Sequence, residues 1–229
     1  GHTAEALSAY QNAVRLNPAN PHYLNNMGMT LQRDGQVHNA IEAYKKAAQI
    51  EPGLSSIHNN LGLAYKEVGQ FEAAIKALKQ AVSQSPGYVQ AWTNLGTVYF
   101  SIHQYDKAEQ AQLKALEIDP EFVDAMINLG STYKEQFRLT ESIEILHKAA
   151  HLDAGKSEIY GNLGLTYSML GDLDNSYAGF EKAARLNPDD PLITGTLIYT
   201  LNFDEHLPQE TIYRRSVDWA NRYYPAVQH

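Results

Sequence analysis

Five asparagines recur at a spacing of 34 residues, each two residues before a glycine in the phrase N-M-G or N-L-G. They are Asn26, Asn60, Asn94, Asn128 and Asn162. A period of this length is typical of solenoids in which each repeat is a helical hairpin that buries its apolar face against its neighbours. The repeat therefore predicts an all-α array, although a chain of 229 residues could otherwise hold one or two globular domains.

A common register brings the small and large residues of all five repeats into phase. Position 1 of each repeat is Pro21, Ser55, Val89, Val123 and Ser157. The first helix is expected at positions 2–14, packing through positions 4, 7, 8 and 11, which share one helical face. Position 8 is always glycine, which weakens a helix by about 1 kcal/mol relative to alanine. Glycine there predicts the close approach of another helix, as do the small residues at positions 20 and 27.

This pattern closely resembles the tetratricopeptide repeat over residues 1–190. Departures are few: Ala154 replaces the helix-ending proline at position 32, Gln112 replaces a large apolar residue at position 24, and His58 occupies position 4. The resemblance implies a right-handed superhelix of antiparallel helix pairs, whose first helices line a concave groove. The predicted organisation is a half repeat at 1–20, five repeats at 21–54, 55–88, 89–122, 123–156 and 157–190, and capping or linker helices at 191–229.

Both ends of the chain depart from the repeat. Residues 1–20 match the second helix of a repeat that lacks its first, so we expect the chain to be cut from a longer array. The missing helix would cover Leu7, Tyr10 and Val14. We expect this apolar face to find a neighbour, a second copy of the chain being one candidate. A sixth repeat would begin at Pro191, but Thr196 replaces its asparagine, and the tail is expected to cap the array.

The tail has a second resemblance, to the segment that joins repeats to the catalytic domain in bacterial SPINDLY and O-GlcNAc-transferase-like glycosyltransferases. The matching residues are Leu201, Phe203, Asp204, Pro208, Glu210, Trp219, Ala220, Tyr223 and Tyr224. The resemblance implies that these repeats recruit protein substrates for such an enzyme, in which an asparagine ladder is implicated in substrate binding. No nucleotide-sugar or catalytic residue is carried over, because the sequence contains no catalytic domain, and this chain is not expected to be an enzyme.

The repeated asparagine faces away from the packing stripe. At 100° per residue around the helix axis, the stripe of packing residues is centred at about 30°. Position 6 lies at about 240°, which places the asparagine on the groove side. An amide carries donors and an acceptor, so a ladder of amides can pair with the main chain of an extended peptide. Neighbouring groove positions vary and would set the sequence preference. They are Asn25, Asn59, Gln90, Thr93, Thr97, Asp124, Ser131 and Glu158.

Two origins of the ladder that involve no ligand stay open from the sequence. The repeats could have been copied without the asparagine having drifted, or the amide could bridge adjacent first helices. The leading hypothesis is a module that binds protein or peptide segments in extended conformation. The alternatives are a self-assembling structural scaffold and a free-standing tetratricopeptide adaptor.

Composition and charge exclude several classes of function. The formal net charge of −8 argues against a nucleic-acid binder, and the absence of cysteine excludes disulfides and thiolate-bound zinc. No apolar run is long enough to span a membrane, so we expect a soluble, cytoplasmic protein. His147 and His151 have the spacing of two metal ligands, but no third ligand is evident. We therefore predict neither a metal nor another cofactor.

Overall fold

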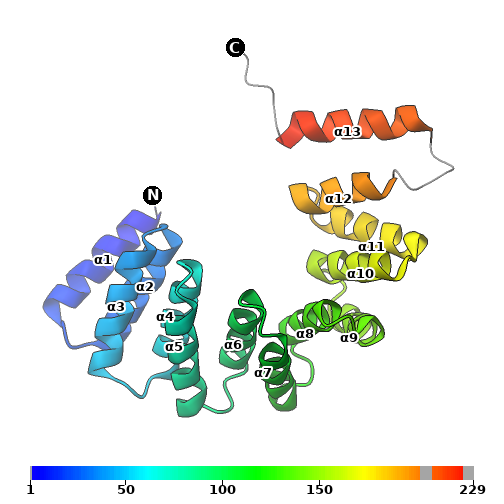
Figure 1. Ribbon diagram of the computed structural model, residues 1–229. Coiled ribbons are helices and arrows are strands. Elements are labelled where there is room, and N and C mark those ends of the chain that lie inside the picture. Colours follow the sequence, from blue (N-terminus) through cyan, green and yellow to red (C-terminus); the bar gives the residue numbers. More distant parts are fainter. Residues whose placement is uncertain (1, 202–207, 224–229) are drawn as a thin grey trace. The chain divides into compact units, whose positions relative to one another are not determined.

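The computed structural model describes residues 2–201 and 208–223, which form thirteen α-helices and no strand (Figure 1). This confirms the predicted all-α class. The helices are α1 (His2–Leu16), α2 (Pro21–Arg33), α3 (Val37–Ile50), α4 (Ser55–Glu67), α5 (Phe71–Gln84), α6 (Val89–Ser101), α7 (Tyr105–Ile118), α8 (Val123–Glu135), α9 (Leu139–Leu152), α10 (Ser157–Leu170), α11 (Leu173–Leu186), α12 (Pro191–Leu201) and α13 (Gln209–Tyr223).

The helices belong to two compact units, Gly1–Phe122 and Val123–His229. In the first unit, α2 with α3, α4 with α5, and α6 with α7 pack as hairpins, and α1 packs on α2. In the second unit, α8 with α9 and α10 with α11 form the same hairpins, followed by α12 and α13. Every hairpin thus pairs the first and second helix of one 34-residue repeat.

The turn inside each hairpin is the same in all five repeats. The N–H of position 16 donates to the carbonyl of position 11, five residues back, as in a Schellman motif. The pairs are Gln36 with Leu31, Gln70 with Tyr65, Gln104 with Tyr99, Arg138 with Tyr133, and Asp172 with Tyr167, at 2.8–3.0 Å. Position 15 then lies in the left-handed region, which glycine adopts without strain. Gly35, Gly69 and Gly171 have φ of 73–77°.

Two repeats place a bulky residue in that left-handed position. His103 and Phe137 both have φ of 59°, a conformation that costs an L-residue roughly 1–2 kcal/mol. The Phe137 side chain is 77% exposed, so little apolar burial would be lost with it. We expect Phe137→Gly to raise the free energy of unfolding by about 1 kcal/mol, measured by thermal denaturation. Gly171→Ala, at the equivalent position, is the control and should lower it by a similar amount; a destabilised Phe137→Gly variant would contradict the strain.

The glycine at position 8 does allow close helix approach. A Cβ built on it would meet the side chain at position 24 of the same hairpin at 2.2–3.0 Å. The pairs are Gly28 with Tyr44, Gly62 with Leu78, Gly96 with Gln112, Gly130 with Leu146 and Gly164 with Phe180. Where serine replaces alanine at position 20, Ser142 and Ser176 donate to the carbonyls of Gly130 and Gly164 at 2.8 and 2.9 Å. Each hydroxyl is thereby satisfied within the core.

The carbonyl of the proline at position 32 links one repeat to the next element. His58 Nε2 donates to Pro52 O at 2.8 Å, and Trp92 Nε1 donates to Pro86 O at 2.9 Å. After the last repeat, the hydroxyl of Tyr223 in α13 bonds to Pro188 O at 2.8 Å. The tail therefore satisfies the same proline carbonyl that position 4 of a following repeat satisfies elsewhere.

The second unit ends in the α12–α13 pair. Trp219 Nε1 donates to Thr194 Oγ1 at 3.0 Å. A Cβ built on Gly195 would lie 2.9 Å from the Trp219 ring, so glycine allows the close packing of the ring. Ile212 is 3% exposed, as expected of a capping residue, whereas Val217 is 37% exposed. Phe203, Asp204 and Tyr224, on which part of the glycosyltransferase resemblance rests, lie outside the described residues.

The three residues of the expected exposed face of α1, namely Leu7, Tyr10 and Val14, are all partly buried. Leu7 and Val14 are partly buried and pack against the core cluster that contains Leu24, Leu31 and Tyr44. The reason is that α1 turns its apolar stripe toward α2. Two of the three residues expected at a homodimer face thus contact the core of their own unit, and the homodimer stays a prediction.

Candidate functional site

The five ladder asparagines lie on the first helix of each hairpin and are all half-buried. We call the surface formed by positions 2, 6, 9 and 13 of these helices the first-helix face. In the first unit it spans α2, α4 and α6, and in the second unit it spans α8 and α10. Each unit's face is described by itself.

In the first unit the amides bridge neighbouring helices. Asn60 Nδ2 donates to Asn25 Oδ1 at 3.0 Å, and Asn94 Nδ2 donates to Asn59 Oδ1 at 2.8 Å. In both pairs a position-6 asparagine bonds to a position-5 asparagine 35 residues earlier. The amide bridge that the sequence left open is therefore confirmed at these two joints.

The bridge leaves each amide with unused hydrogen-bonding capacity. A carboxamide has two N–H donors and an oxygen with two lone pairs. The bridge uses one N–H of Asn94 and none of its Oδ1 capacity. The remaining N–H and the oxygen match the C=O and N–H of a peptide unit. The bridge also fixes the orientation of the side chain, which reduces the entropy lost when a ligand binds.

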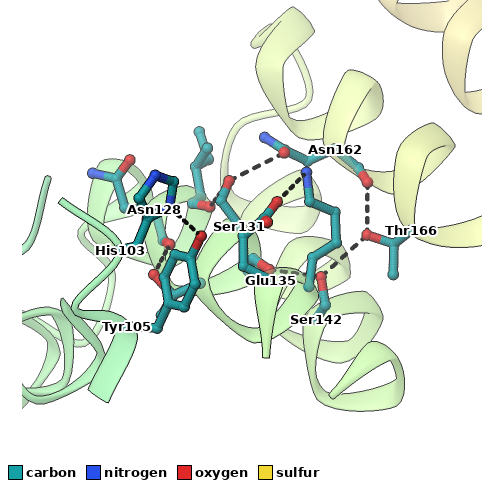
Figure 2. A network of polar contacts seen from close by, with 12 residues as sticks. His103, Tyr105, Asn128, Ser131, Glu135, Ser142, Asn162 and Thr166 are labelled. Carbon is teal, nitrogen blue, oxygen red and sulfur yellow. Dashed lines mark hydrogen bonds and ion pairs between the residues drawn. The ribbon is translucent and has the colours of Figure 1, made fainter. Parts of the chain in front are cut away.

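In the second unit the contacts of the asparagines differ. The Ser131 hydroxyl lies 3.1 Å from both Asn162 Oδ1 and the carbonyl of Ile127. Asn162 Nδ2 donates to Glu158 O, one turn earlier in the same helix, at 3.0 Å. Figure 2 shows Ser131 and Asn162 pointing toward one another from α8 and α10.

Two buried hydroxyl groups lie next to the backbone of Asn162. Thr166 Oγ1 donates to the carbonyl of Asn162 at 2.8 Å and lies 3.2 Å from Ser142 Oγ (Figure 2). Thr166 and Ser142 are both fully buried. A satisfied buried network of this kind holds α10 against α9 in one arrangement.

Two ladder asparagines have unengaged side-chain amides. Among the described residues of its own unit, the side-chain amide of Asn26 and that of Asn128 make no hydrogen bond. Only their backbone carbonyls are used, by Thr30 and Thr132. Both residues are half-buried, and the donor and acceptor groups of their amides are not used within their own unit.

The predicted groove neighbours fall into three groups by exposure. Gln90, Asp124 and Glu158 are exposed, and Asn25, Thr97 and Ser131 are half-buried. Asn59 and Thr93 are only 5% exposed, so they support the helices rather than line an accessible surface. The Thr93 hydroxyl bonds to its own helix at Val89 O, 3.0 Å away.

Sequence reasoning missed three residues beside the ladder. Lys156 forms an ion pair with Asp124, whose carboxylate raises the pKa of the lysine. Leu165 and Met169 lie on α10 and are 41% and 44% exposed. Position 13 carried the sequence signal that could have identified the apolar residues, because it is polar in the other four repeats and is Met169 in the fifth.

The histidine pair shows no metal-binding arrangement. His147 Nε2 lies 3.1 Å from the hydroxyl of Tyr167, so a protein partner already occupies that nitrogen. Across residues 2–201 and 208–223 there is no group of three histidine, aspartate or glutamate side chains placed to hold a metal ion. None of the described helices has the length and apolar character needed to span a membrane.

A family model described as "Cilia and flagella-associated protein 70 C-terminal domain" matches residues 18–220. The match covers all five repeats and most of the tail. Among curated proteins, none matches the sequence significantly.

Solved structures with the same fold include three proteins that cover most of this chain. YrrB, described as a TPR protein with an unusual peptide-binding site, has a TM-score of 0.62 and 19% identity, covering 83% of this chain and 98% of its own. PilF of Pseudomonas aeruginosa has a TM-score of 0.73 and 17% identity, covering 99% and 95%. MamA has a TM-score of 0.62 and 27% identity, covering 71% and 95%. These likenesses confirm the tetratricopeptide-repeat fold.

Proposed function

The chain belongs to the family of the cilia and flagella-associated protein 70 C-terminal domain, a tetratricopeptide-repeat family, and on this premise we propose that it binds extended polypeptide segments on its first-helix face. Its structural neighbours include a peptide-binding repeat protein. The coarser role, a protein–protein interaction module, follows from the fold. The finer role rests on the asparagines.

The observation that carries the proposal is the unengaged amide capacity along the ladder. Asn26 and Asn128 offer complete carboxamides, and the oriented amides of Asn60 and Asn94 keep at least one N–H and part of their acceptor capacity. Each amide can hold the main chain of a ligand through about 0.5–1.5 kcal/mol per hydrogen bond. Several such bonds are needed for useful affinity, and several asparagines on adjacent helices supply them.

Alanine substitutions distinguish asparagines that only bind the ligand from those that also stabilise the contacts between helices. Asn128→Ala should weaken peptide binding by about 0.5–1.5 kcal/mol per lost bond while leaving thermal stability nearly unchanged, because the amide has no partner among the described residues of its own unit. Asn94→Ala should weaken binding and also lower stability by about 1–3 kcal/mol, because it removes the donor to the buried Asn59 Oδ1. Titration calorimetry with a peptide selected for binding to the unmodified chain measures the affinity, and thermal denaturation measures the stability.

A matched control is Asn175→Ala, which removes an asparagine that lies outside the first helices. Asn175 is exposed at the start of α11 and bonds only to Asp172. It should leave peptide affinity unchanged. If Asn26→Ala and Asn128→Ala together also leave affinity unchanged, the ladder serves the helix joints alone and the proposed binding role is wrong.

A narrower proposal is that the module recruits substrates for an O-GlcNAc-transferase-like enzyme. Its support is the tail resemblance, of which Leu201, Pro208, Glu210, Trp219 and Tyr223 lie in described residues. In the structure, Trp219 and Tyr223 are also tied to Thr194 and Pro188. A glycosyltransferase domain encoded after the repeats in the parent reading frame would support this narrower role, and a different domain there would contradict it.

A further inference from the structure

The first-helix face of α10 changes character along its length. Leu165 and Met169 are one turn apart, so they share one side of the helix with Asn162. They are 41% and 44% exposed, whereas the other repeats have polar residues at position 13. Those residues are Arg33, Glu67, Ser101 and Glu135. An exposed apolar pair thus stands directly beyond the amide toward the end of α10.

The opposite end of the same face is acidic. Glu158 lies one turn before Asn162 and is exposed, as is its equivalent Asp124 on α8. Asp124 is paired with Lys156, whereas the Glu158 carboxylate contacts the Ser157 hydroxyl at 3.4 Å and contributes to the raised pKa of Lys156 without a direct ion pair. Among the described residues Glu158 forms no ion pair, so its exposed carboxylate can pair with a ligand.

An extended peptide held at its main chain would meet both ends of this face. Successive side chains of an extended chain point in opposite directions. If Asn128 and Asn162 hold the backbone, one side chain points toward Glu158 and the next toward Leu165 and Met169. One end of the face is acidic and the other is apolar, so the two ends select different kinds of side chain at neighbouring positions of the ligand.

We propose that the α8–α10 surface recognises a basic residue directly adjacent to a large apolar residue in an extended protein segment. This proposal rests on the proposed function, because the asparagines must hold the ligand's main chain. The basic side chain pairs with Glu158, and the apolar side chain packs on Leu165 and Met169.

The test is a selection of random twelve-residue peptides on the full chain and on three variants. Met169→Glu copies the glutamate that repeat 4 has at position 13. Glu158→Gln removes the negative charge while keeping the size of the side chain. Leu152→Glu is the control, since Leu152 is 42% exposed at the end of α9, away from the first helices.

The unmodified chain should enrich adjacent basic–apolar pairs. For a selected peptide, Met169→Glu should weaken affinity about tenfold through lost apolar contact, and Glu158→Gln about threefold, with a smaller salt dependence. Leu152→Glu should change neither the affinity nor the enriched motif. Peptides that need Asn128 but carry no such pair would overturn this inference and leave the proposed function standing. Selected peptides whose affinity is insensitive to Asn128→Ala, or no selected peptides at all, would overturn both.

Discussion

Replacing Gly179 with alanine is expected to destabilise the protein by about 1–3 kcal/mol, the usual cost of overpacking a core. A Cβ at this position would stand 2.8 Å from the backbone nitrogen and 2.9 Å from the Cα of Gly164, and 3.0 Å from the carbonyl of Tyr160. All three atoms belong to the backbone of α10, so no side-chain rotation relieves the clash. The α10–α11 hairpin would have to separate.

The repeat pattern predicts the opposite result. Three other repeats have alanine at this position, namely Ala43, Ala77 and Ala111, and alanine favours a helix by about 1 kcal/mol over glycine. A consensus argument would therefore expect Gly179→Ala to stabilise the protein. The contact between the backbones at Gly179 and Gly164 reverses that expectation.

Gly161→Ala is the matched control within the same hairpin. Gly161 also lies inside α10, but apart from its chain neighbours and the adjacent backbone of its own helix, no described atom lies within 4 Å of a Cβ there. This substitution should raise the free energy of unfolding by up to about 1 kcal/mol. Urea denaturation followed by circular dichroism measures both variants. Equal effects of the two substitutions would show that α10 and α11 are not packed as closely as described.

Gln112→Leu is expected to stabilise the protein by about 1–3 kcal/mol, the penalty for a buried polar atom without a partner. Gln112 is only 1% exposed. Its Nε2 donates to the carbonyl of Thr93 at 3.1 Å, but its Oε1 has no hydrogen-bond partner in the part of the chain that the structure describes. Leucine would remove the unsatisfied oxygen and fill the same space with apolar atoms.

The neighbouring repeats show that the site accepts leucine. Leu78 and Leu146 occupy the same position above Gly62 and Gly130, and both are fully buried. For a chain of this size, 1 kcal/mol shifts the melting temperature by about 2–4 °C. The expected increase is therefore measurable by thermal denaturation.

The reciprocal change, Leu78→Gln, serves as the control. It introduces a buried carboxamide at a position that is apolar now, and it should lower stability by about 1–3 kcal/mol. If Gln112→Leu destabilises the protein instead, the Gln112 oxygen is satisfied in solution and its amide is an integral part of the α6–α7 joint.

Contacts within one hairpin were predictable from the sequence. Glycine at position 8 and a large residue at position 24 are 16 residues apart in every repeat, and the turn between them has constant length. Their packing is therefore set by local geometry, and the predicted close approach is confirmed at Gly62 against Leu78. The Gln112 departure was also visible, but its unsatisfied oxygen was not, because the available donors depend on the surrounding helices.

Contacts between hairpins were less predictable. Asn60, Asn94 and Asn128 occur in nearly identical phrases, yet the first two bridge neighbouring helices and the third has an unengaged amide. Within the first unit, the bonds of Asn60 and Asn94 depend on which residue the preceding repeat brings within reach. Leu7 and Val14, expected on an exposed face, are instead partly buried against the core of the first unit.

By itself, the sequence determined the all-α repeat class, the register of its helices and the position of the asparagines on the first helix of each hairpin. These follow from a 34-residue period and helical geometry, which act over short stretches of chain. Only the tertiary structure decided which amides are engaged, which neighbours are buried, and where the exposed Leu165 and Met169 stand beside Asn162. Those properties depend on side chains from helices about one repeat apart, whose separation is set by packing.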